Sequence, residues 1–198
     1  MRHQLFVLPS AVLLLAASAS GAAAQNQSAY TDVDLAQCLI MHSDDFGSSW
    51  ACPGYRGYPV RIAEGDLRFF VSYGFGAEEQ PAAGQTLPPF NTLGPKIEWR
   101  LKNVGGDWRP FATILRYHVE AIEDPEAIEG GLGGDVLVVT QLGDEPGTQC
   151  HIAWVDASAN ADANELAREA ADTLAGDFRC GDSMPRIMGE EFAAFGIE

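Results

Sequence analysis

Three histidines, His42, His118 and His151, are the residues best suited to acid–base chemistry, since imidazole titrates near neutral pH. His42 stands beside Asp44 and Asp45, which makes it either a general acid or base or a solvated loop residue. A serine nucleophile would need an exposed turn such as Gly-x-Ser-x-Gly, which the sequence lacks. The sequence therefore predicts no catalytic residue, and a hydrolase would have to use these histidines.

Metal ligands are also sparse. His118 and His151 are both predicted on the polar face of a sheet, but no third ligand can be placed beside them. Asp156, Ser158, Asn160 and Asp162 alternate as in a calcium loop. Such a loop needs Gly at its sixth position and Glu at its twelfth, where this chain has Ala161 and Ala167. We predict no metal site and no cofactor.

Basic residues gather in one predicted hairpin, between residues 96 and 120. This segment has five Lys and Arg residues against three acids, whereas the rest of the chain beyond Ala24 carries a net charge of −19. It is a candidate face for an anion or a partner, unless neighbouring acidic loops neutralise it. The candidate face comprises Lys96, Arg100, Lys102, Arg116 and His118.

A second candidate is the Gly- and Pro-rich segment 76–95. Loops of this length are often functional. Its apolar tip, Leu87, Pro88, Pro89 and Phe90, could reach a partner or fold back into the core. The aromatic residues Trp50, Tyr55 and Tyr58 could likewise stack on a ligand or pack within the fold.

The beginning of the chain is typical of a secretory signal peptide. Arg2 and His3 precede an apolar run from Leu5 to Ala17, and Ala22-Ala23-Ala24 is typical of a cleavage site. We expect a mature protein that begins near Gln25 and is soluble in the periplasm or secreted. No later segment is apolar and long enough to insert stably in a membrane.

Beyond Arg2 the chain has 28 acidic and 11 basic residues, a net charge of −17. This charge argues against nucleic acid and anionic membranes as partners. It favours fast association with a basic protein, and the basic face leaves an anion-bearing protein as the alternative.

The four cysteines predict two disulfides, because the count is even and the chain is predicted to be exported. A strand beginning at Cys150 and a helix over 162–175 that returns antiparallel would bring Cys180 beside Cys150. Cys150, Ile152 and Trp154 would share the face that the helix covers. Cys38 then pairs with Cys52 by elimination.

The elements that must position these residues are three hairpins and a helix. Alternating apolar and polar residues predict strand pairs at 60–63 and 67–73, 96–103 and 111–119, and 135–142 and 149–155. Residues 25–198 are thus predicted to form a single disulfide-bonded α+β domain. It would have an antiparallel sheet of about six strands and a C-terminal helix packed on one face. The pattern does not place residues 184–198.

Two strings carry a resemblance to known sequences: residues 45–55, DFGSSWACPGY, and residues 89–99, PFNTLGPKIEW. They resemble a group of uncharacterised exported bacterial proteins. The resemblance covers most of the mature chain and implies export, but it implies no site.

Three functional classes follow from these patterns. The first is a non-enzymatic periplasmic protein with a binding or structural role. The second is an inhibitor of a basic secreted enzyme of the lysozyme type, suggested by the charge and the 76–95 loop. The third is a hydrolase with a site that no motif marks.

Overall fold

The computed structural model describes residues 26–121, 133–189 and 194, and within them the chain forms ten strands, four short 3-10 helices and one α-helix. The strands are β1 (Gln27–Asp32), β2 (Leu39–Ser43), β3 (Gly47–Cys52), β4 (Val60–Gly65), β5 (Arg68–Tyr73), β6 (Asn91–Val104), β7 (Asp107–Val119), β8 (Gly134–Gln141), β9 (Cys150–Asp156) and β10 (Arg186–Met188). The helices are η1 (Leu35–Gln37), η2 (Tyr55–Gly57), η3 (Ala77–Glu79), η4 (Pro81–Gly84) and α1 (Ala163–Leu174).

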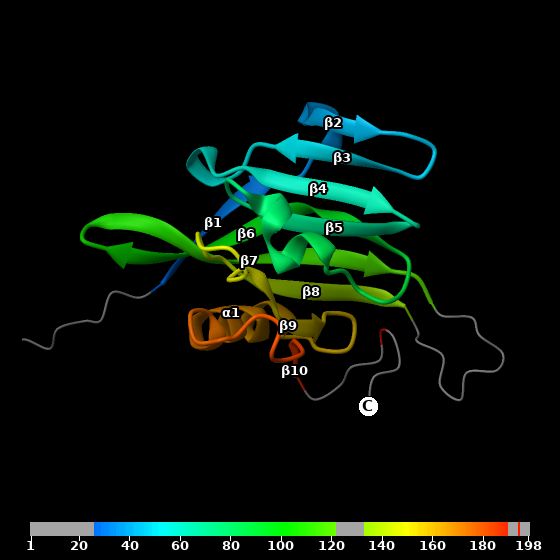
Figure 1. The fold of residues 1–198 in the computed structure, drawn as a ribbon. Coiled ribbons are helices and arrows are strands. Elements are labelled where there is room, and N and C mark those ends of the chain that lie inside the picture. The colour runs from blue at the N-terminus through cyan, green and yellow to red at the C-terminus, as the bar shows by residue number, and fades with distance from the viewer. Residues whose placement is uncertain (1–25, 122–132, 190–193, 195–198) are drawn as a thin grey trace, which may run out of the picture.

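The strands form two sheets rather than one. A six-stranded sheet has the order β1-β6-β7-β8-β9-β10, and a four-stranded sheet has the order β2-β3-β4-β5 (Figure 1). All neighbouring strands are antiparallel except β9 and β10. The prediction of antiparallel pairing with a C-terminal helix is confirmed. The prediction of about six strands in one sheet is wrong, because the 60–73 hairpin joins β2 and β3 in a sheet of its own.

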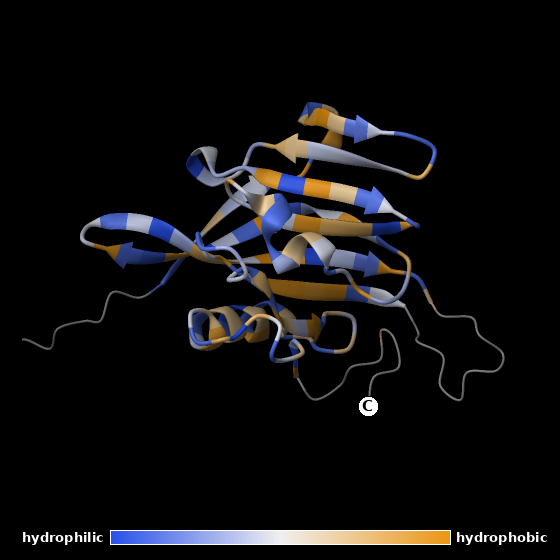
Figure 2. Ribbon diagram, in the orientation of Figure 1, coloured by the Kyte–Doolittle hydropathy of each residue, from blue (hydrophilic) through white to orange (hydrophobic). Residues whose placement is uncertain are grey.

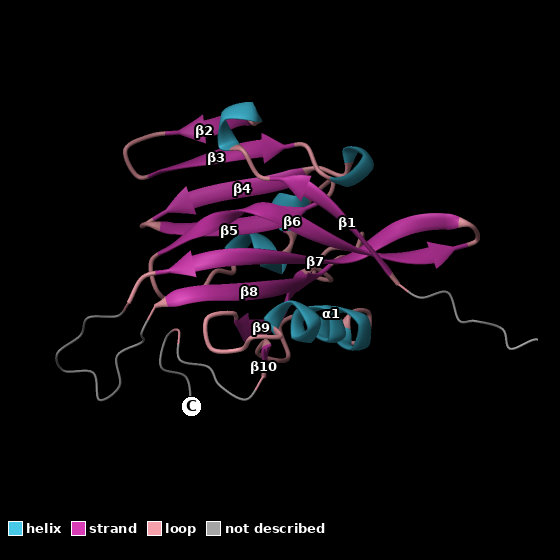
Figure 3. Cartoon of the chain, turned by 180° about the vertical axis from the view of Figure 1, so that it is seen from behind, coloured by secondary structure: helices cyan, strands magenta, loops and turns pink. Residues whose placement is uncertain are grey.

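The strands missing from the prediction lack a clear alternating pattern. β1 lies at one edge of its sheet beside β6, as Figure 3 shows from behind. β3 is rich in Gly and Ser, and β10 has only three residues. β6 also starts five residues earlier than expected, at Asn91, and a register shift between Leu93 and Ile97 accommodates Gly94 and Pro95. Proline cannot donate to a regular ladder, so such an irregularity is where a strand tolerates it.

The main core lies between the two sheets. Ile97, Trp99 and Leu101 of β6 are at most 4% exposed, as their alternation predicts, and they pack with Val60 and Ile62 of β4. Tyr73 meets the Trp99 ring edge-on at a centroid distance of 5.5 Å. The period of two along each strand thus fills one shared core from both sheets.

A second core lies on the other face of the six-stranded sheet, under α1 (Figure 1). The helix presents small residues, Ala163, Ala167, Ala170 and Ala171, so it can lie close to the strands. β8 therefore has protein on both sides, which explains its nearly continuous apolar run in Figure 2. The predicted helix is confirmed, beginning at Ala163.

Both predicted disulfides are present. Cys38 pairs with Cys52 and Cys150 with Cys180, with Cα atoms 4.5 and 5.7 Å apart. The predicted shared face is wrong in one residue, because a register shift where Val139 and Thr140 pair with β9 reverses the alternation there. Cys150 and Ile152 belong to the helix-side core, whereas Trp154 packs in the core between the sheets.

The signal-peptide prediction falls on residues 1–24, which lie outside the described residues. Among the described helices, none has the length and hydropathy needed to cross a bilayer. Of the unplaced tail, the structure describes β10 and its flanks up to Gly189, together with Ala194.

Candidate functional site

The predicted basic face is only partly exposed to solvent, because Arg100 within it is buried. Its alternation is correct, but α1 covers part of it, and the Arg100 side chain is only 7% exposed. Arg100 donates to both carboxylate oxygens of Asp172 on α1, at 3.0 and 2.5 Å, and to Ser28 Oγ at 2.6 Å. The expectation that Arg100 is free for a ligand is therefore corrected: it attaches the sheet to the helix.

Glu98 extends this buried polar cluster. Its carboxylate accepts from Arg168 Nε at 2.7 Å and from Ser28 Oγ at 2.5 Å. The hydrogen bond with Glu98 raises the pKa of Arg168 further above its ordinary value, so the guanidinium is always charged. Residues 98, 100, 168 and 172 thus form a charged clamp between β6 and α1.

Three other residues of the predicted face contact two aspartates, Asp135 and Asp32. Arg116 Nη1 lies 2.9 Å from Asp135 Oδ2, and His118 Nδ1 lies 2.6 Å from Asp135 Oδ1. Lys96 pairs with Asp32 at 2.5 Å. Only Lys102, of the five predicted residues, makes no ion pair within the described part of the chain.

The three histidines lie in three separate places. His42 is exposed on β2, 3.0 Å from Asp44. His151 is fully buried beside Trp154, on the opposite side of the sheet from His118. Within residues 26–121, 133–189 and 194, no three potential ligands gather into a metal site.

The calcium-like string is a turn before the helix. The Asp156 carboxylate accepts from the backbone N–H groups of Ser158 and Ala159, both at 2.9 Å. Side chains of this kind stabilise the approach to a helix without any ion.

The 76–95 segment folds back into the core. Leu87 is completely buried, and the Asn91 amide donates to the Pro89 carbonyl at 2.8 Å. Pro88 and Phe90 stay at the surface, where Arg68 donates to the Pro88 carbonyl and lies 5.0 Å from the Phe90 ring centroid. The apolar tip therefore packs into the core through the Leu87 side chain.

The aromatic turn also packs within the fold. Trp50 stacks on Phe69 with ring centroids 6.5 Å apart. Tyr55 and Tyr58 lie 6.3 and 5.8 Å from the Trp99 ring. Tyr58 also lines a pocket.

That pocket, here called the hairpin groove, has a volume of about 520 Å³. Five of its lining residues belong to β6 and β7, whose hairpin end protrudes from the body of the molecule in Figure 1. Its lining residues are Tyr58, Lys102, Val104, Arg109, Pro110, Phe111, Leu142, Gly143 and Asp144.

Two cations line the groove side by side. Lys102 and Arg109 are direct cross-strand partners in the β6–β7 register. Lys102 Nζ also lies 5.9 Å from the centre of the Phe111 ring. Arg109, like Lys102, makes no ion pair with any residue that the structure describes.

Asp144 and Tyr58 also line the groove. Burial raises the pKa of the Tyr58 phenol, and the charge of Asp144 raises it further. The phenol is therefore neutral at physiological pH and can donate a hydrogen bond. The groove thus combines two cations, a phenol, a carboxylate and an apolar floor.

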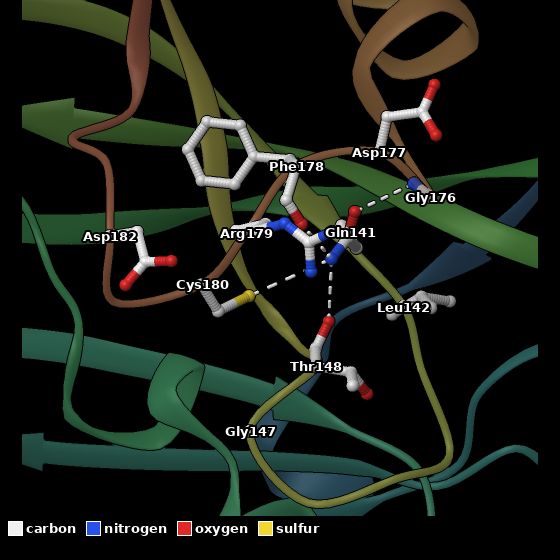
Figure 4. Close-up of a pocket in the computed structure, with 10 residues that line it drawn as sticks. All are labelled: Gln141, Leu142, Gly147, Thr148, Gly176, Asp177, Phe178, Arg179, Cys180 and Asp182. Atoms are coloured by element: carbon white, nitrogen blue, oxygen red, sulfur yellow. Dashed lines mark hydrogen bonds between the residues drawn. The ribbon is translucent and has the colours of Figure 1, made fainter.

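A second pocket of about 430 Å³ meets the hairpin groove at Leu142. Its lining includes Cys180 (Figure 4), which is bonded to Cys150. Gln141 lies at its centre. It donates to the Thr148 and Phe178 carbonyls at 2.8 and 3.2 Å, and its oxygen accepts from the Gly176 N–H at 2.8 Å. These bonds hold the 147–148 and 176–180 segments together. The Gln141 side chain thus links two segments that line the pocket.

Arg109 was not among the predicted site residues, although the sequence contains a signal for it. A turn at Val104–Asp107 requires Lys102 to stand opposite Arg109, and two like charges in that position are unfavourable without an anion. The net charge of the hairpin as a whole does not show that these two cations face each other.

Comparisons with protein families, curated proteins and solved structures find no match for this chain. The fold and the geometry of its pockets therefore carry the functional argument alone.

Proposed function

We propose that the chain is an exported, non-enzymatic binding protein whose hairpin groove holds an organic anion with an apolar body. The observation that carries this proposal is the Lys102–Arg109 cross-strand pair, which makes no ion pair with the described residues. The chain has 28 acidic residues, so acids to neutralise such a pair are abundant. A ligand anion would supply the missing charge.

The groove fits both the anionic group and the apolar body of such a ligand. A guanidinium binds carboxylate or phosphate oxygens in a two-point geometry, and the neighbouring ammonium adds a point charge. An apolar surface for the body of the ligand is offered by Phe111, Pro110 and Val104. A volume of about 520 Å³ lies within the range of small-molecule sites.

Binding can be tested with phenyl phosphate as the probe, with inorganic phosphate and phenol as its two halves. Isothermal titration should show phenyl phosphate binding more tightly than either half and weakening with salt, because the contact is electrostatic. Replacing both cations, Lys102→Gln with Arg109→Gln, should weaken binding at least tenfold. The matched variant Lys96→Gln with Arg186→Gln removes the same charge elsewhere.

The proposal is wrong if both double variants weaken binding equally, since that would reflect net charge alone. It is also wrong if wild-type protein binds phenol as well as phenyl phosphate, because the cations would then contribute nothing.

Export is part of the proposal and rests on the Arg2 start, the apolar run and the Ala22-Ala23-Ala24 end. The two disulfides support an oxidising compartment, the periplasm or the exterior. Mass spectrometry of protein from its native host should find an N-terminus at or near Gln25. A chain that retains residues 5–17 would contradict export by this signal.

The structure gives less support to the two other classes, the lysozyme-type inhibitor and the hydrolase. A lysozyme-type inhibitor acting through the 76–95 loop would need the apolar tip at the surface, whereas Leu87 is in the core. A hydrolase would need its histidines near a substrate, whereas His42, His118 and His151 lie apart.

A further inference from the structure

We infer that the free edge of β2 is a docking strand for an extended, basic segment of a partner protein. This inference is independent of the hairpin groove. It rests on an edge strand whose side chains are apolar and whose surroundings are acidic.

The backbone of β2 is available for pairing. β2 lies at the edge of the four-stranded sheet, and among the described residues it pairs only with β3. The outer side of an edge strand presents N–H and C=O groups that accept another strand. The chemistry of this edge therefore selects an extended segment.

The side chains of β2 are unusually apolar for an edge. Leu39, Ile40 and Met41 are 68%, 63% and 54% exposed, and Phe46 in the following turn is 88% exposed. Edge strands are ordinarily protected by lysine or proline. Residues 25–52 contain no Lys, Arg or Pro, so this edge has no such protection.

The edge is also held in place before any partner arrives. The Cys38–Cys52 disulfide closes the base of the β2–β3 hairpin, and Asp44 Oδ1 accepts from the N–H groups of Phe46 and Gly47 at 2.8 and 3.1 Å. A preformed strand loses less conformational entropy on binding.

Charge decides the kind of partner. Residues 25–55 contain no Lys or Arg, and of their four acids only Asp32 pairs with a Lys or Arg among the described residues, which leaves Asp34, Asp44 and Asp45 for a basic partner. A basic strand would gain from these charges, whereas a second copy of this acidic chain would be repelled. The occupant we assign is therefore a strand with alternating apolar and basic residues.

The test uses a peptide of about ten residues, a common strand length, that alternates lysine and valine. A second peptide replaces lysine with glutamate, and a third is the lysine peptide with a methyl group on every backbone nitrogen. Fluorescence anisotropy measures affinity, and hydrogen exchange locates the contact. We expect the lysine peptide to bind and to protect amides in residues 39–43. The methylated peptide, which cannot donate its backbone hydrogen bonds, should bind at least tenfold more weakly.

Variants separate the edge from the rest of the surface. Leu39→Ser with Met41→Ser changes only exposed side chains and should weaken the lysine peptide at least fivefold. Phe75→Ser removes an 88% exposed side chain elsewhere and should have no effect.

Four results would overturn the inference. They are no binding of the lysine peptide, equal binding of the methylated peptide, equal binding of the glutamate peptide, and a dimer in sedimentation that Leu39→Ser with Met41→Ser dissolves. The last result would assign the edge to a second copy of this chain.

Discussion

The Arg100 guanidinium and the Asp172 carboxylate meet in a two-point ion pair that joins β6 to α1. Nε lies 3.0 Å from Oδ1, and Nη2 lies 2.5 Å from Oδ2. The Arg100 side chain is 7% exposed and the Asp172 side chain 31% exposed. Because little water reaches Arg100, its charge is compensated by this carboxylate and by Glu98, whose Oε1 lies 3.9 Å from Arg100 Nη1.

Asp172→Asn should lower the free energy of unfolding by about 1 to 3 kcal/mol, a range reduced from that of a fully buried pair because Asp172 is partly exposed. Urea denaturation measures the change. Glu169→Gln is the matched control on the same helix, and it should stay within about 0.5 kcal/mol of wild type because that residue is exposed. Equal losses in both variants would show that the ion pair contributes nothing beyond helix charge.

His151 should make the protein less stable as the pH falls through the mildly acidic range. Burial lowers its pKa to about 4, whereas an unfolded histidine titrates near 6.5. Between these values the unfolded chain binds a proton that the folded protein does not, so stability present above about pH 6.5 is lost towards pH 4. The loss should be on the order of 2 to 3 kcal/mol.

His151→Leu should remove this dependence, and it also removes Nε2, which has no hydrogen-bond partner among the described residues. Urea midpoints from pH 7 to pH 4 should fall more for wild type than for the variant. The exposed His42→Gln variant should follow wild type. Parallel curves for wild type and His151→Leu would contradict the burial argument.

Asp135 should contribute stability that is lost at lower pH. Burial by itself would raise its pKa, but hydrogen bonds from His118 and Arg116 outweigh burial and leave the pKa lowered. The contribution is therefore present above the unfolded value of about 3.9 and lost as the pH falls through the lower folded value. Asp135→Asn should destabilise the protein at pH 6, and the difference should narrow below about pH 4. Asp45→Asn is the control, and a difference that widens in acid would contradict the assignment.

The Cys150–Cys180 disulfide should contribute about 3.5 kcal/mol, since it closes a segment with a sequence separation of 30. Cys150→Ala with Cys180→Ala should lower the urea midpoint accordingly. Because Cys180 lines the pocket in Figure 4, the same change should increase hydrogen exchange at residues 176–180. Unchanged exchange there would show that the Gln141 bonds hold the wall without the disulfide.

Local patterns were enough to predict several parts of this protein. The period of two in β6 and β7, the helix over 162–175 and the pairing of Cys150 with Cys180 were all predicted correctly, since each depends on neighbours or on one short return of the chain. The site was predicted less well. Lys102 was identified as a candidate, whereas Arg109 was missed and Arg100 proved to be structural.

Only the tertiary structure decided which alternating face is covered. The strand pattern around Arg100 shows that its side chain points away from Trp99, but it does not show that α1 lies over that side. The split into two sheets, the burial of Leu87 and the reversal at Trp154 depend in the same way on contacts between distant segments or on a bulge. Sequence determines alternation because backbone geometry is local, whereas burial depends on which distant element packs on each face.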